Sequence, residues 1–179
     1  LFFGGLSTNS VGSIPVLMQF EIDTDAVSPN TYTSFLPITV SDEDLLGEPF
    51  VGRGGKLLDK ILAAINLSRD KVFILNVLKC RPPENRDPKS DEIEKCEPYL
   101  KKQLKIIKPK LIVALGRISA MTLLKTKDSL GNMRNKIHKY ENIDLLVTYH
   151  PAALLRNTNL KGAAWEDFKF IKKEYLNGE

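Results

Sequence analysis

The stretch LIVALGR, residues 111–117, decides the fold class of this 179-residue chain. Its five consecutive apolar residues predict a strand that is buried on both faces, and Gly116 ends that strand. Residues 117–125 have the pattern of a helix that begins directly after the glycine. A buried strand followed at once by a helix is typical of a parallel sheet with helices on both faces.

Working outward from this stretch, strands and helices alternate along the chain. Further buried strands are expected over residues 72–78 and 145–148, and helices over residues 57–65, 90–104 and 163–175. Pro98 is expected to split the second of these helices in two, because proline lacks the N–H of a helix bond. The alternation predicts a single three-layer α/β/α domain over residues 1–179, with its site at the carboxyl ends of the strands.

The charge is distributed unevenly along the chain. Residues 1–52 contain seven acids and no Lys or Arg, so all 26 basic residues lie in 53–179 beside the other 15 of the 22 acids, a net charge of +11. Such a basic body favours an anionic partner such as nucleic acid, although a lysine-rich solvated surface has the same composition.

Composition also excludes several classes of protein. No apolar run approaches the roughly 20 residues that span a bilayer. The first twenty residues lack the basic start of a secretory signal, and two cysteines are too few for a disulfide scaffold. We therefore expect a soluble, intracellular domain that does not contact membranes.

Two loop features allow both a functional and a structural interpretation. The glycine-rich stretch GEPFVGRGGK, residues 47–56, leads into a helix and either cradles a phosphate or is an ordinary turn. It is not a nucleotide-binding P-loop, because Leu57 follows Lys56 where Ser or Thr is required. Phe50 is either a platform for stacking or a core residue.

Polar residues at strand ends are the stronger candidates for a site. Asn76 interrupts an apolar strand, so its amide either caps backbone or reads a ligand that presents both a donor and an acceptor. His150 ends a strand directly before Pro151 and is either catalytic or structural, whereas His138 lies among charges and is expected at the surface. From spacing alone, Cys80 and Cys96 are buried thiols.

Taken together, the motifs of the chain resemble the iron–sulfur class of uracil-DNA glycosylases, known as family 4. The matching stretches, in order, are DEDLLGEPFVGRGGKLL (42–58), NVLKCRPPENRDP (76–88), CEPYL (96–100), KLIVALG (110–116) and HPAALLRN (150–157). The resemblance extends over about residues 41–179. The resemblance implies the α/β/α fold of that superfamily, with a central, mainly parallel four-stranded sheet, and an enzyme that removes uracil from DNA.

The resemblance also implies residue roles. Phe50 would stack on the flipped uracil, with Asn85 as a weaker candidate nearby. Asn76 would donate to O4 and accept from N3–H, a pattern that cytosine reverses. His150 would donate to O2 as negative charge grows there, and Glu43 would stabilise the sugar or orient water.

Contacts to the DNA itself are expected from two groups of residues. Leu154, Leu155 and Arg156 would fill the gap left by the extruded base. Lys56, Arg117 and Arg156 are the candidates for phosphate contacts. The substrate would be uracil-containing DNA, single- or double-stranded. The resemblance further implies a prokaryotic, cytoplasmic enzyme that acts as a monomer.

The family binds a [4Fe–4S] cluster through four cysteines, and Cys80 and Cys96 match two of them. Residues 1–40 hold neither the family's other two cysteines nor its Gly-Glu-Ala-Pro-Gly motif, so we expect the cluster to be absent or incomplete. We interpret residues 1–40 as divergent or non-native, through a shifted reading frame or a fusion. The alternatives are a divergent active enzyme and a catalytically weak uracil- or DNA-binding relative.

Overall fold

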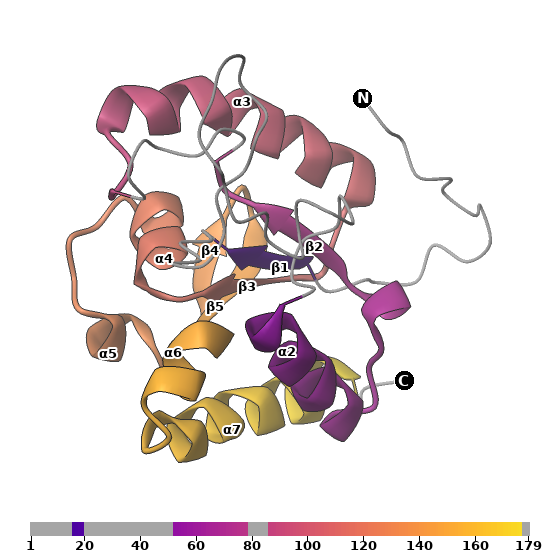
Figure 1. The fold of residues 1–179 in the computed structure, drawn as a ribbon. Helices are drawn as coiled ribbons and strands as arrows, with labels where there is room; N and C mark the ends of the chain where they lie inside the picture. Colours follow the sequence, from indigo (N-terminus) through magenta and orange to yellow (C-terminus); the bar gives the residue numbers. More distant parts are fainter. Residues whose placement is uncertain (1–15, 20–51, 79–85, 177–179) are drawn as a thin grey trace, which may run out of the picture.

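A five-stranded sheet forms the centre of the protein in the computed structural model (Figure 1). The structure describes residues 16–19, 52–78 and 86–176. The strands are β1 (Val16–Gln19), β2 (Phe73–Asn76), β3 (Leu111–Leu115), β4 (His138–Tyr140) and β5 (Ile143–Thr148), in the spatial order β2-β1-β3-β5-β4. The first four strands of this order are parallel, and only β4 is antiparallel.

The expected α/β/α fold with a mainly parallel sheet is therefore confirmed, but the sheet has five strands where four were expected. Strand β4 pairs with β5 through a tight hairpin whose two turn residues, Glu141 and Asn142, have φ values of 49° and 65°. Two central residues with positive φ are typical of the turns that match the twist of paired strands. The hairpin adds β4 at the edge of the sheet.

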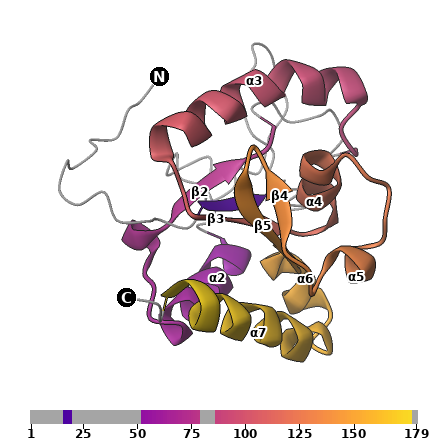
Figure 2. The same cartoon turned by 180° about the vertical axis from the view of Figure 1, so that it is seen from behind.

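The alternation of side chains in β3 explains the three layers. Ile112 and Ala114 belong to one buried cluster, to which helices α3 and α4 contribute. Leu111, Val113 and Leu115 belong to a second cluster, which contains residues of α2 and α7. Figures 1 and 2 show the result: α3 lies on one side of the sheet, and α2 and α7 lie on the other.

The helices largely follow the expected ranges. They are α2 (Arg53–Ala64), α3 (Ser90–Ile107), α4 (Arg117–Leu124), α5 (Leu130–Met133), α6 (Pro151–Arg156) and α7 (Leu160–Ile171), with a 3-10 turn at Arg69–Lys71 and a π-helical turn at Lys172–Leu176. The expected break at Pro98 is wrong, because α3 continues through it. Leu100 and Leu104 are buried after the proline, and this packing outweighs the lost helix bond.

Residues 16–19 form β1 at the centre of the parallel strands, between β2 and β3. No strand was predicted from the sequence at residues 16–19, so β1 is a finding of the structure. The rest of residues 1–40 lies outside the described residues, and the origin of this segment stays a prediction. None of the described helices is long and apolar enough to cross a membrane.

Candidate active site

The carboxyl ends of the four parallel strands lie side by side, in register, and form one end of the sheet, which we call the strand edge. Asn76 pairs with Gln19, Gln19 with Leu115, and Leu115 with Thr148. Asn76 is half-buried as the last residue of β2. The sheet therefore brings Asn76 and the segment leading to His150 to the same edge, as the strand-end rule predicts.

Gly116 places the end of β3 against His150. Its φ is 88°, and its N–H donates to the carbonyl of Thr148 at 2.8 Å. A β-carbon at position 116 would lie 3.0 Å from the Cβ of His150, which is closer than side chains normally approach. Glycine is therefore required here both for its conformation and for its lack of a side chain.

His150 is the N-cap residue of α6, and this role determines which of its ring nitrogens carries the proton. The backbone N–H of Ala152 donates to Nδ1 of His150 at 3.2 Å. A ring nitrogen that accepts a hydrogen bond carries no proton, so the neutral imidazole carries its hydrogen on Nε2. The cap thus gives His150 the tautomer that can donate a hydrogen bond from Nε2.

The N-terminal ends of three helices meet near His150. Helix α4 begins directly after Gly116, and α6 begins directly after His150. The first turn of α2 packs against α6, where a β-carbon at Gly54 would lie 3.7 Å from the backbone nitrogen of Ala152. None of the three helices has an acid in its first turn, so their dipoles make this region electropositive and suited to anions.

A buried polar network holds the two residues that precede His150 in the sequence, and it was not predicted. It joins Thr148 and Tyr149 to Arg134 and Asp167. The only signal in the sequence was the position of two hydroxyl residues before a strand-end histidine. Arg134 and Asp167 are far apart in the sequence. Each stands next to a polar residue in the sequence, as exposed residues commonly do.

The predicted DNA-contact residues are exposed around this edge. Lys56 lies in the first turn of α2, and Leu155 and Arg156 lie at the end of α6. Arg117 opens α4, and its guanidinium pairs with Asp87 at 3.0 Å. Leu154 was expected in the wedge, but it is 2% exposed and packs inward, because adjacent residues of a helix point in different directions and only Leu155 faces outward.

The remaining predicted site residues are Glu43, Phe50, Asn85 and Cys80, and they lie outside the described residues. His138 is another correction. It is half-buried in β4, and its Nε2 lies 2.7 Å from the carbonyl oxygen of Met133. The hairpin that creates β4 turns this histidine inward, away from the surface position expected from its charged neighbours.

Comparison with known families agrees with this geometry. The model of the uracil DNA glycosylase superfamily matches residues 36–169, which is most of the chain. The chain belongs to the uracil DNA glycosylase superfamily. The family resemblance expected from the sequence motifs is therefore confirmed, and with it the fold.

Members of this superfamily classed as type 4 are among the chain's similar proteins. The type-4 uracil-DNA glycosylase of Archaeoglobus fulgidus is 46% identical over 138 residues, covering 73% of this chain and 69% of the relative. That of Sulfurisphaera tokodaii is 48% identical over 141 residues, covering 74% and 64%. That of Thermotoga maritima is 40% identical over 141 residues, covering 74% and 73%. The match thus spans about two thirds to three quarters of these relatives.

The residues of this chain do not fit a four-cysteine iron–sulfur cluster. The sequence contains two cysteines, of which Cys96 is buried beside Leu78, Ile93 and Ile118. Within residues 52–78 and 86–176, no three His, Cys, Asp or Glu side chains are grouped so that they could hold a metal. A [4Fe–4S] cluster takes four cysteine thiolates, so half of the ligand set is missing from this chain.

Proposed function

We propose that this chain is a DNA-repair glycosylase that flips uracil out of DNA and hydrolyses its N-glycosidic bond. The observation that carries the proposal is the position of the capped His150 at the carboxyl ends of the parallel strands, where Asn76 also lies. Membership of the superfamily and similarity to proteins named type-4 uracil-DNA glycosylases support it. A role in repair would place the protein in the prokaryotic cytoplasm, where the DNA is.

In this proposal His150 stabilises the departing uracil. As the N-glycosidic bond breaks, negative charge develops on uracil O2, and a donor aimed at that oxygen lowers the barrier. Because Nδ1 accepts from Ala152, the neutral ring presents Nε2–H as the donor. A preorganised donor of this kind is worth roughly 3–4 kcal/mol in the transition state.

Asn76 is the proposed base reader. Its amide NH₂ would donate to O4 of uracil, and its amide oxygen would accept from N3–H. Cytosine presents a donor and an acceptor in the reverse order, so the same amide disfavours it. Phe50 and Asn85 are proposed to contact the base, and Glu43 to stabilise the sugar or orient the attacking water.

The DNA backbone is proposed to lie across the three helix N-termini. Lys56, Arg117 and Arg156 are exposed around them and would neutralise phosphates. Leu155, on the exposed face of α6, would fill the space of the extruded base. Single- and double-stranded DNA both fit this arrangement, and we propose that the protein acts as a monomer.

A second candidate is a catalytically weak or inactive relative that binds uracil or DNA. It is favoured by residues 1–40, which contain no Lys, Arg or Cys and stand where the family's first motif is expected. In this alternative the segment is not the family's native one. The strand-edge site would then bind its ligand without completing hydrolysis.

One assay distinguishes these functions. A labelled single-stranded oligonucleotide with one uracil is incubated with the protein and then cleaved with alkali at any abasic site. We expect cleavage at the uracil and far slower cleavage in a matched oligonucleotide that carries cytosine there. Binding without cleavage, even at stoichiometric protein, would instead establish the binding relative, and the absence of both would exclude a role on uracil-containing DNA.

Variants at Asn76 test the base-reading role in the same assay. Asn76→Ala should lower the ratio of uracil to cytosine cleavage, because it removes both hydrogen bonds that distinguish the bases. Asn132→Ala, at an exposed position on α5, is the matched control and should leave the ratio unchanged. Equal ratios in the wild type and Asn76→Ala would exclude Asn76 as the base reader.

A further inference from the structure

Arg134 and Asp167 form a buried ion pair between two distant parts of the chain. Arg134 follows α5, and Asp167 lies in α7. Both side chains are only 8% exposed. The guanidinium binds the carboxylate through two hydrogen bonds, from Nε and from one terminal nitrogen, each 2.9 Å long. Burial lowers the pKa of Arg134, but the hydrogen bonds that it donates to the Asp167 carboxylate outweigh burial and hold that pKa above its usual value.

The remaining bonds of this pair converge on the two residues that precede His150. The hydroxyl of Thr148 donates to Asp167. A terminal nitrogen of Arg134 donates to the Tyr149 hydroxyl at 3.3 Å, and the guanidinium carbon lies 4.4 Å from the centre of the Tyr149 ring. The guanidinium also donates to the carbonyl of Ala163 at 2.7 Å, which anchors it to α7.

These contacts cross the end of the molecule where the site lies. Figures 1 and 2 both show α5, α6 and the beginning of α7 side by side at one end of the sheet. The ion pair therefore connects the segment after α5 to α7. Its hydrogen bonds with Thr148 and Tyr149 also fix the carboxyl end of β5. His150 is the next residue, and its main chain continues directly from this tethered segment.

We propose that Arg134 and Asp167 are positioning residues that fix the direction of the His150 side chain. The inference rests on the proposed function, because it assigns them to the same reaction. Two contacts determine the orientation of the imidazole ring of His150. The cap to Ala152 acts from the helix side, and the Thr148–Tyr149 tether acts from the strand side. Because Gly116 packs within contact of His150, a small shift of the strand end changes where Nε2 points.

A simple structural role for the ion pair predicts something different. A buried pair often adds little net stability, and replacing both partners by apolar residues of similar size is frequently neutral. A purely structural pair could thus be replaced without loss of activity as long as the fold persists. A positioning pair could not, because the tether to Thr148 and Tyr149 would be lost while the fold remained.

The test compares the double variant Arg134→Met/Asp167→Leu with Arg134→Lys and with the control Tyr140→Phe. Arg134→Lys keeps the charge but loses the two-pronged bond. Tyr140→Phe removes a tyrosine hydroxyl that bonds Glu97 at 3.2 Å, near the opposite end of β5. Thermal unfolding establishes that each variant is folded at the assay temperature. If the double variant does not fold, Thr148→Val takes its place, because it removes a single hydroxyl.

Two readouts are measured on the folded proteins. The first is kcat and KM on the uracil oligonucleotide. The second is the ¹⁵N spectrum of the imidazoles without DNA, which is simple because the chain has only two histidines and His138→Gln assigns them. We expect the double variant to lose about 10- to 100-fold in kcat with KM within about threefold. We also expect His150 to change from one tautomer to a mixture, with a smaller change in Arg134→Lys.

An unchanged kcat in the folded double variant, or in Thr148→Val if that is the variant that folds, would overturn the inference. So would an equal loss in Tyr140→Phe. The two proposals fail separately. If the wild type does not excise uracil, the proposed function fails. The ¹⁵N spectra then still decide whether Arg134 and Asp167 hold His150 against its cap, because the ring loses its single tautomer if it leaves the Ala152 N–H.

Discussion

Gly116 lies directly against His150, so that a β-carbon at position 116 would come within 3.0 Å of the Cβ of His150. The backbone of Gly116, with φ 88° and ψ 172°, is in a region that only glycine adopts readily. We therefore expect Gly116→Ala to cost roughly 1–3 kcal/mol of stability. It should also lower the rate of uracil excision, because the new methyl group displaces His150. Thermal unfolding and single-turnover excision measure the two effects.

The matched control for this prediction is Gly54→Ala. The nearest atom to a β-carbon at Gly54 would be the backbone nitrogen of Ala152 at 3.7 Å, an ordinary contact. Within α2 the substitution also favours helix formation, by about 0.5–1 kcal/mol. Equal losses of stability and rate in the two variants would show that the contact at Gly116 has no special role.

The ion pair between Arg86 and Glu92 makes the stability of α3 depend on pH. Hydrogen bonds from Arg86, the shortest at 2.6 Å, and from the backbone of Lys89 lower the pKa of Glu92 to about 2. A carboxyl group whose pKa is lower in the folded than in the unfolded protein stabilises the fold at pH values above its unfolded pKa of about 4.3. This stabilisation is lost as the pH falls towards the folded pKa. Glu92→Gln keeps the helix cap but removes the charge, so it should melt below the wild type at pH 7.

That difference in melting temperature should shrink as the pH falls from about 4.5 to about 2. Melting curves of both proteins over this range measure it, and Glu94→Gln on the same helix is the control, because no hydrogen bond or ion pair to Glu94 is found among the described residues. A gap between wild type and Glu92→Gln that stays constant down to pH 2 would contradict the role of the ion pair.

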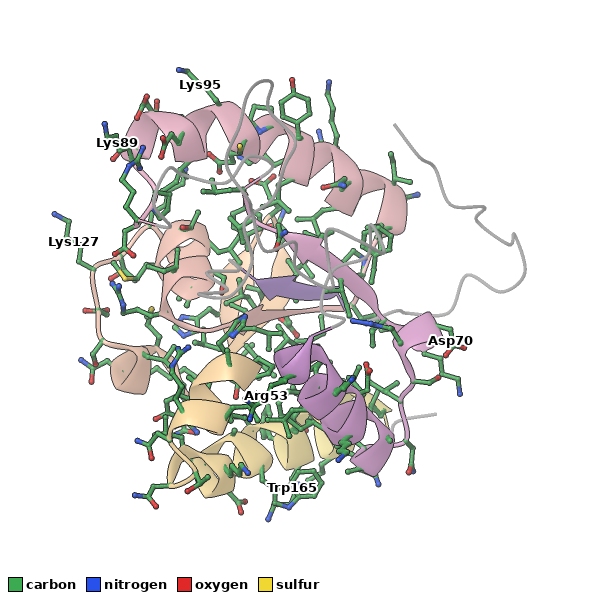
Figure 3. The ribbon with its side chains drawn as sticks, viewed as in Figure 1. Arg53, Asp70, Lys89, Lys95, Lys127 and Trp165 are labelled. Carbon is green, nitrogen blue, oxygen red and sulfur yellow. The ribbon has the colours of Figure 1, made fainter. Side chains whose placement is uncertain are left out.

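The affinity for DNA should fall steeply with salt. Each phosphate contact that is removed should reduce the slope of log affinity against log salt by about one. We expect this for Lys56→Gln and for Arg156→Gln. Lys95→Gln is the control: Figure 3 shows Lys95 projecting outward from α3, on the other side of the sheet from α2. Equal slopes for all four proteins would exclude phosphate contacts by Lys56 and Arg156.

The layers of the fold were predictable because they depend on local patterns. Five apolar residues in β3 indicate a strand buried on both faces, and the alternation of its side chains between two clusters follows from strand geometry. Helix α3 was harder, because the packing of Leu100 and Leu104 that overrides Pro98 is not visible in the local sequence. Strand β4 was missed because three residues with mixed polarity carry little strand signal.

The site was predictable where its residues stand at strand ends. Asn76 could be selected from the sequence because a polar residue within an apolar run is unusual, and His150 because it ends an apolar strand directly before a proline. Arg134 and Asp167 could not, because their burial depends on how α5 and α7 meet beside β5. Leu154 and Leu155 look alike in sequence, and only the packing of α6 assigns one to the core and the other to the surface.

The chain should contain no [4Fe–4S] cluster. It supplies at most two of the four thiolates that such a cluster takes, Cys80 and Cys96. Iron analysis and an absorbance scan near 400 nm on anaerobically purified protein measure this, and we expect neither iron nor the band. Four irons per chain would show that other residues supply the missing ligands. Cys96→Ala is the informative variant, because loss of iron in it would identify Cys96 as a ligand.

The donor role of His150 is the central claim, and the single-turnover rate of uracil excision tests it most directly. His150→Ala removes the Nε2–H donor, while His138→Ala removes the chain's other histidine, which contacts the Met133 carbonyl instead. With saturating protein, we predict that His150→Ala lowers the rate about 10²–10³-fold, whereas His138→Ala stays within about threefold of the wild type. A rate for His150→Ala equal to that of the wild type would contradict the account.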